Sequence, residues 1–116
     1  MQNLYCWRCN ADMPMLDETE FEVVSKLLSE GIVATKEYRE RFGLSLAELN
    51  LKERFVPALD AYFRITGFRE SNPSALWHHR LSLYGPPCPG CGRPFRTPRA
   101  QLCAACGWSP GVAAPP

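Results

Sequence analysis

Two stretches decide the fold, Cys88-Pro-Gly-Cys91-Gly92 and Cys103-Ala-Ala-Cys106-Gly107, which repeat one pattern with eleven residues between the cysteine pairs. Tetrahedral Zn²⁺ takes four soft ligands, and two CxxC turns supply two thiolates each. Glycine after the second cysteine allows the backbone to turn sharply with positive φ, so that amide N–H groups point at the sulfurs. The sequence therefore predicts a zinc site with four ligands: Cys88, Cys91, Cys103 and Cys106.

Residues 86–108, which contain both cysteine pairs, resemble a zinc ribbon, a short hairpin-like module closed by one metal ion. Small bacterial proteins that carry such a ribbon are similar in this segment. The resemblance implies the metal and the local fold. Because zinc ribbons serve many functions, it implies no particular activity.

A third CxxC pair, Cys6 and Cys9, is followed by Asn10, one of the few residues besides glycine that tolerate the left-handed region. We expect a half-ribbon here, with two ligands missing. They could come from the histidines at 78 and 79, from a second copy of the chain, or from nowhere. Adjacent histidines on a helix diverge by about 100°, so they seldom bind the same ion. His79, at the edge of the apolar stripe, is therefore a better candidate ligand for a site with Cys6 and Cys9 than His78, which lies almost opposite the stripe. The preferred interpretation is nevertheless that both histidines are ordinary polar residues beside the core.

Between the cysteine pairs the sequence predicts helices. Asp17 and Glu20 form a capping-box pattern for a helix that ends near residue 30, before Gly31. The acidic residues of its first turns suit the helix dipole, so they indicate no catalytic pair. A short second helix is expected over 35–42, stopped by Gly43. Ser45 and Glu48 begin a third helical stretch, which Pro57 either kinks or restarts and which ends at Gly67. Another helix is expected over 74–84, with Asn72 as its cap and Pro73 at its first position.

The predicted fold is mainly α, with three to five helices. The expected parts are an N-terminal half-ribbon at 1–15, a helical body at 16–85, a zinc ribbon at 86–108 and a disordered tail at 109–116. Aromatic residues of the body, among them Phe55, Tyr62 and Phe63, are expected in the core. Since both ends carry metal turns, we expect the ends to meet on one side of the helices and form the working face.

Composition favours a cytoplasmic protein. The 116 residues contain no long apolar run and begin with no signal-peptide pattern. In a reducing compartment, three CxxC pairs indicate metal ligands rather than disulfides. An enzyme is not expected, because no βαβ pattern supports a redox CxxC and four cysteine ligands leave no open position on zinc. A deaminase signature is also absent.

Charge is unevenly distributed along the chain. Residues 1–70 carry 9 basic and 12 acidic side chains, whereas residues 71–116 carry four arginines and no acidic residue. Such a distribution attracts an anionic partner, or holds the two parts together. Arg80 lies on an apolar stripe, so it either pairs with a carboxylate of the body or anchors a partner.

The candidate partner-binding residues flank the last cysteine pair: Arg93, Phe95, Arg96, Arg99 and Trp108. Tryptophan and arginine are common interface anchors, so the preferred function is a zinc-stabilised protein-interaction module, such as a small bacterial regulator or a toxin-neutralising protein. The alternative is a nucleic-acid-binding ribbon that uses the arginines and aromatic stacking. The aromatic residues could also simply wall the metal sites.

Overall fold

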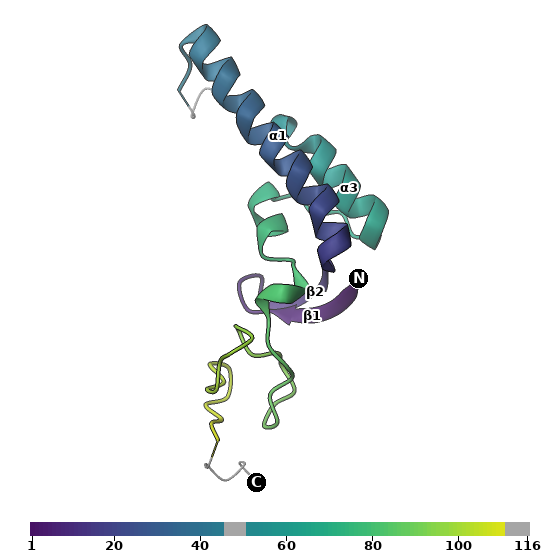
Figure 1. Ribbon diagram of the computed structural model, residues 1–116, viewed down its shortest axis with the longest axis vertical. Coiled ribbons are helices and arrows are strands. Elements are labelled where there is room, and N and C mark those ends of the chain that lie inside the picture. Colours follow the sequence, from purple (N-terminus) through teal and green to yellow (C-terminus); the bar gives the residue numbers. More distant parts are fainter. Residues whose placement is uncertain (46–50, 111–116) are drawn as a thin grey trace.

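The computed structural model describes residues 1–45 and 51–110. The molecule is elongated, with extents of 60 × 28 × 20 Å. In Figure 1 the helices occupy one end, a small hairpin lies in the middle, and the C-terminal segment extends away on the other side. No helix in the described ranges is long and apolar enough to cross a membrane.

The N-terminal element is an antiparallel hairpin of β1 (Gln2–Cys6) and β2 (Ala11–Met15), paired from Gln2 with Met15 to Cys6 with Ala11. The CxxC pair spans the start of its connecting turn, since Cys6 ends β1 and Cys9 lies in the turn. Asn10 closes the turn with φ of 56°, which confirms the expected left-handed position. The hairpin thereby presents both cysteines at one end of a rigid two-stranded element.

Helix α1 runs from Glu18 to Phe42 without a break. The capping box of Asp17 and Glu20 and the stop at Gly43 (φ 64°) are confirmed. The expected end before Gly31 is wrong, and so is the separate helix over 35–42. Gly31 is buried where the Phe55 ring crosses the helix, and a Cβ there would lie 2.8 Å from that ring. This glycine allows close packing rather than ending the helix.

Helix α3 (Val56–Thr66) packs along α1, preceded by a single turn, α2 (Leu51–Arg54). Pro57 lies in the first turn of α3, so it starts a new helix, and Gly67 ends it with φ of 75°.

Phe63 is 37% exposed under the Arg69 guanidinium rather than in the core. Glu48, the partner in the expected Ser45 cap, lies outside the described residues. The core between the helices comprises Leu16, Phe21, Val24, Leu28, Ala58, Leu59, Ala61, Tyr62 and Leu76.

The segment 74–84 is not the expected α-helix. It forms two short 3₁₀ turns, η2 (Pro73–Trp77) and η3 (Leu81–Leu83), with extended backbone between them. Asn72 and Pro73 do begin η2 as expected. The helix is interrupted because Leu16 pairs with this segment: its N–H donates to the His79 carbonyl and its carbonyl accepts from Leu81, each at 2.9 Å.

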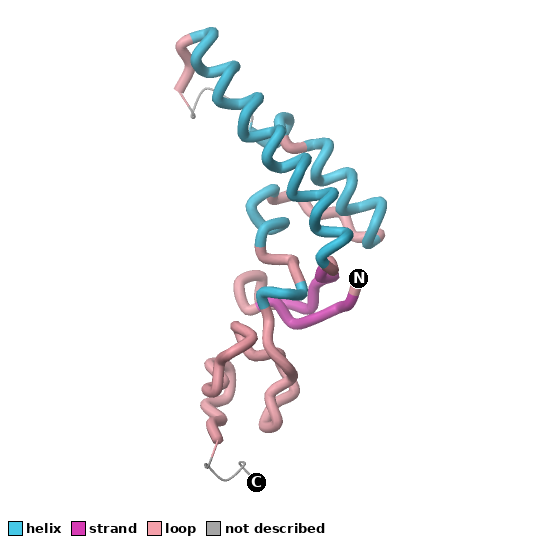
Figure 2. The backbone as a smooth tube through the Cα atoms, in the orientation of Figure 1, coloured by secondary structure: helices cyan, strands magenta, loops and turns pink. Residues whose placement is uncertain are grey.

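The expectation of three to five helices is therefore wrong. Within the described residues, the α-helices longer than one turn are α1 and α3, and α2 is a single turn of four residues. The C-terminal module, residues 86–108, consists of turns, drawn as loop in Figure 2, with one bridge between Pro87 and Pro94. The expected disordered tail falls largely outside the described residues, since the description ends at Pro110.

Candidate metal centres

The first candidate centre is the group of four cysteines in the C-terminal module. Their sulfurs all lie within 4.8 Å of one another, and none is in a disulfide. Cys88 Sγ is 3.7 Å from Cys106 Sγ, and Cys91 Sγ is 3.7 Å from Cys103 Sγ. With Zn–S bonds of about 2.3 Å, two thiolates of a tetrahedral site would be about 3.8 Å apart. The predicted set of four ligands is thus confirmed as one cluster with the spacing that such an ion requires.

Each turn of this module has the backbone of a metal-binding turn. Gly92 and Gly107 have φ of 79° and 80°, and their N–H groups donate to the carbonyls of Cys88 and Cys103 at 2.8 and 2.7 Å. The N–H of Gly90 donates to the Cys88 sulfur at 3.3 Å. Donors aimed at sulfur stabilise the thiolate that a metal needs.

The pKa values of two thiols in this cluster, Cys103 and Cys106, shift in opposite directions. Burial opposes ionisation of Cys103, but the N–H groups of Cys106 and Ala105 outweigh it and lower its pKa to about 7. At Cys106 the Trp108 N–H lowers the pKa, whereas burial and the neighbouring sulfurs raise it to about 12. The Cys103 thiolate therefore forms readily, whereas the Cys106 thiolate would be favoured by a cation between the sulfurs.

Aromatic side chains close the inner side of this cluster. Phe95 is 6% exposed and packs against Cys88 and Cys103, and the half-buried Trp108 lies beside it with ring centroids 5.9 Å apart. Phe95 therefore belongs to the interior of the module, and Trp108 offers part of one ring to solvent. Of the five expected partner-binding residues, the three arginines are exposed.

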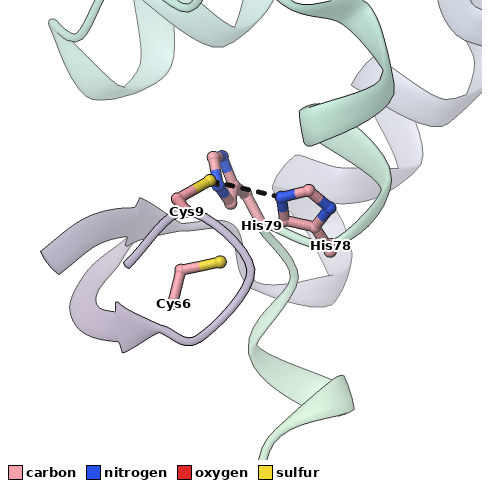
Figure 3. Close-up of side chains that lie close together, drawn as sticks. All are labelled: Cys6, Cys9, His78 and His79. Carbon is pink, nitrogen blue, oxygen red and sulfur yellow. Dashed lines mark hydrogen bonds between the residues drawn. The ribbon is translucent and has the colours of Figure 1, made fainter. Parts of the chain in front are cut away.

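The second candidate centre brings Cys6 and Cys9 of the hairpin turn together with His78 and His79, nearly seventy residues later in the chain. Cys9 Sγ lies 3.4 Å from His78 Nε2 and 3.3 Å from His79 Nε2. Figure 3 shows both imidazole rings approaching Cys9, with Cys6 below them. A zinc ion with bonds of about 2.3 Å to sulfur and 2.0–2.1 Å to nitrogen would hold such atoms about 3.5 Å apart. The four donors fit a tetrahedral Cys₂His₂ site.

His78 joins this group against expectation. On the helix expected over 74–84, the side chains of neighbouring residues would diverge. His78 instead follows η2, and the backbone extends into Arg80 (φ −130°, ψ 122°), so both rings can face the hairpin turn. Of the sources considered for the missing ligands, the structure favours both histidines of the same chain.

The orientation of His79 is fixed by a buried tyrosine. The Tyr62 hydroxyl donates to the Pro14 carbonyl at 2.6 Å and lies 3.3 Å from His79 Nδ1. Because that hydroxyl proton is already used, this network assigns the ring proton to Nδ1 and leaves the Nε2 lone pair facing Cys9. Burial lowers the pKa of His79 to about 4, which keeps the ring neutral. A neutral ring with Nε2 free is the form that binds a metal.

A second buried tyrosine lies against Cys6. The Tyr84 hydroxyl donates to the His78 carbonyl at 2.9 Å and lies 3.5 Å from Cys6 Sγ.

Burial, together with the neighbouring Cys6, raises the pKa of Cys9 to about 11. A cation at the centre of the four donors would reverse this shift, since it favours the thiolate form.

The arginines near the two centres contact aromatic rings. Arg93 lies over Tyr5 with 3.9 Å from Cζ to the ring centroid, and Arg96 lies over Trp7 at 4.3 Å. These contacts join the C-terminal module to the hairpin, so the two metal turns do lie together. Arg80 follows the first of its two expected roles: it donates to the Glu18 carboxylate at 2.8 Å.

Sequence reasoning missed the supporting hydroxyls of Tyr62 and Tyr84 and the role of Tyr5 in the hairpin. Tyr62 was placed in the core by its helical spacing, which says nothing about its hydroxyl. Tyr5 precedes Cys6 directly, and that position beside a metal turn was an available signal. Trp7 was expected to be exposed beside arginines, and it is 38% exposed under Arg96.

No protein-family model, curated protein or solved structure matches the chain.

Proposed function

We propose that the chain is a protein-interaction module stabilised by two structural zinc ions. The observation that carries this proposal is that each cluster offers four protein donors, either four thiols or two thiols and two imidazoles. A structural zinc site is closed in this way, whereas a catalytic site keeps a position for water or substrate. Cysteine and neutral histidine in tetrahedral sets favour zinc over magnesium, calcium or manganese.

The working surface of the module is its basic end, where the hairpin turn and the C-terminal module meet. Arg8, Arg93, Arg96 and Arg99 are exposed there, and Trp7 is 38% exposed among them. Arginine and tryptophan are the side chains most enriched among interface hot spots. Two metal centres hold the backbone of this end rigid, which lowers the entropy lost on binding. A bacterial regulator or toxin-neutralising protein would use such a surface.

Nucleic-acid binding remains the second candidate, because the same four arginines could contact phosphates. Two observations weigh against it. Asp12 lines the surface beside Arg93, so a continuous phosphate track would meet a carboxylate. Phe95, one of the two rings expected to stack on bases, is buried.

The zinc part of the proposal is tested by native mass spectrometry of protein purified without chelator. We expect two zinc ions per chain, one after Cys103→Ser and one after His79→Ala. Glu22→Ala on the exposed face of α1 is a control that should keep both. A folded chain with no zinc would refute the proposal.

The partner is tested by photo-crosslinking in the native host. A benzoylphenylalanine placed at Leu102, 61% exposed on the C-terminal module, should crosslink to one protein. The same group at Lys36, on the far part of α1, should not. Crosslinks to nucleic acid, or equal protein capture from both positions, would contradict the proposal.

A further inference from the structure

The hairpin and the C-terminal module enclose a cavity of about 150 Å³. Its lining includes Tyr5, Trp7, Asn10, Arg93 and Arg96. We propose that this cavity, the arginine–aromatic cleft, receives a carboxylate side chain from an acidic segment of a partner protein. The inference rests on the proposed function and names the chemistry of its partner.

The cleft has hydrogen-bond donors without a matching anion. The ion pairs of the described residues involve the N-terminus with Glu20, Arg69 with Asp60, and Arg80 with Glu18. Within that part of the chain, Arg93 and Arg96 therefore have no carboxylate partner. The Tyr5 hydroxyl donates to Asn10 Oδ1, which leaves the Asn10 amide N–H₂ as a further donor.

Aromatic rings hold the two guanidinium groups in place. Arg93 is 3.9 Å above Tyr5, and Arg96 and Arg8 lie 4.3 and 4.9 Å from the Trp7 ring. A guanidinium that stacks by its face still presents its N–H edge, and that edge matches the two oxygens of a carboxylate. Since the stacking is already made, little side-chain entropy remains to be lost when the anion binds.

Size and surrounding charge favour a single carboxylate over a polyanion. The volume corresponds to about five water molecules, and whole small-molecule ligands occupy pockets of about 300 Å³ or more. Asp12 borders the neighbouring surface together with Arg93, which disfavours a chain of phosphates. One glutamate or aspartate of a protein segment fits both limits.

The experiment is a titration of zinc-loaded, ¹⁵N-labelled protein, followed through the Trp7 Nε1–H and the arginine Nε–H signals. The probes are a blocked peptide of four glutamate–glycine pairs, its glutamine counterpart, and an oligothymidine with the same number of charges. We expect saturable shifts with the glutamate peptide, at least about tenfold tighter than with either other probe. Equal binding of the glutamine peptide would overturn the inference, and so would tighter binding of the oligothymidine.

Variants locate the binding. Arg93→Gln with Arg96→Gln should weaken the glutamate peptide about tenfold or more, whereas Arg93→Lys with Arg96→Lys, which keeps the charge without the fork, should weaken it less. Arg69→Gln is the matched control, because Arg69 stacks 4.0 Å over Phe63 but already pairs with Asp60. Should the glutamine pair lose zinc, the lysine pair still tests the site. Unchanged affinity in a folded double variant would refute it.

The outcome is separable from that of the proposed function. If a crosslinked partner binds the Arg93→Gln, Arg96→Gln variant with undiminished affinity, the cleft is not its docking site and this inference fails, while the interaction module stands. If the glutamate peptide binds in the cleft but no protein is crosslinked from Leu102, the cleft is retained and the proposed function fails.

Discussion

Replacing Tyr62 with phenylalanine tests whether the fold itself prepares His79 as a ligand. The ring is fully buried in the core between α1 and α3, and the substitution removes only the hydroxyl, so packing is retained. It leaves the Pro14 carbonyl and His79 Nδ1–H without their buried partner. We expect two separate losses, one in folding stability and one in metal affinity.

The stability loss follows from the two hydrogen bonds. A buried polar group that loses its partner costs about 1–3 kcal/mol. The 2.6 Å hydrogen bond to the Pro14 carbonyl is short and the 3.3 Å contact with His79 is long. We therefore expect the free energy of unfolding to fall by about 2–3 kcal/mol in total. For a chain of this size that corresponds to a fall in Tm of roughly 10 °C. Thermal unfolding followed by circular dichroism at fixed free zinc measures it.

The metal affinity falls because the imidazole is no longer held in the right tautomer and orientation. Loss of such a supporting hydrogen bond typically costs about 10–100-fold in affinity. Competition with a chromophoric chelator should show this loss at one of two zinc sites. Tyr38→Phe, on α1 away from both centres, is the matched control. If Tyr62→Phe changes neither Tm nor zinc affinity relative to that control, the proposed support of His79 is wrong.

Three further predictions concern other contacts. Gly31→Ala should lower stability by about 1–3 kcal/mol in denaturant titrations, because its Cβ would clash with Phe55; a stabilised variant would show that α3 can shift. Cys91→Ser should cost one zinc ion by elemental analysis and leave the α1 circular dichroism signal, whereas full loss of helix would contradict the separation of the two centres. The hydrogen bond from Arg80 lowers the pKa of Glu18 to about 2. The stability that this pair gives to the fold is therefore fully present above the ordinary pKa of a glutamate and is lost as pH falls toward about 2. The difference in Tm between wild type and Glu18→Gln should therefore shrink with falling pH, and a constant difference would refute the pairing.

The features predicted well from the sequence are those set by neighbouring residues. A CxxC turn with glycine or asparagine after it closes by its own hydrogen bonds, so all three turns and the left-handed Asn10 followed from local chemistry. The same holds for the Asp17 capping box and for the stop at Gly43. Such signals need no knowledge of the remaining chain.

The features predicted wrongly depend on partners distant in sequence. Gly31 looks like a helix stop until Phe55 is placed against it. The segment 74–84 has helical spacing, yet Leu16 takes its backbone hydrogen bonds and turns His78 toward the hairpin. The second metal centre could therefore be only half predicted, because its ligand set is completed by an interruption of the expected helix.

The two metal centres differ in how far along the chain their ligands are separated. Cys91 and Cys103 are close enough in sequence for the C-terminal centre to form from a short loop, whereas Cys9 must wait for His78, 69 residues later. Closing a longer loop costs more chain entropy, and contacts between residues distant in sequence form more slowly. During synthesis, the first cysteine pair would leave the ribosome well before its histidines exist. If this cluster binds zinc, those two thiols would be exposed to oxidation or to other metals until the histidines are made and the helices have packed.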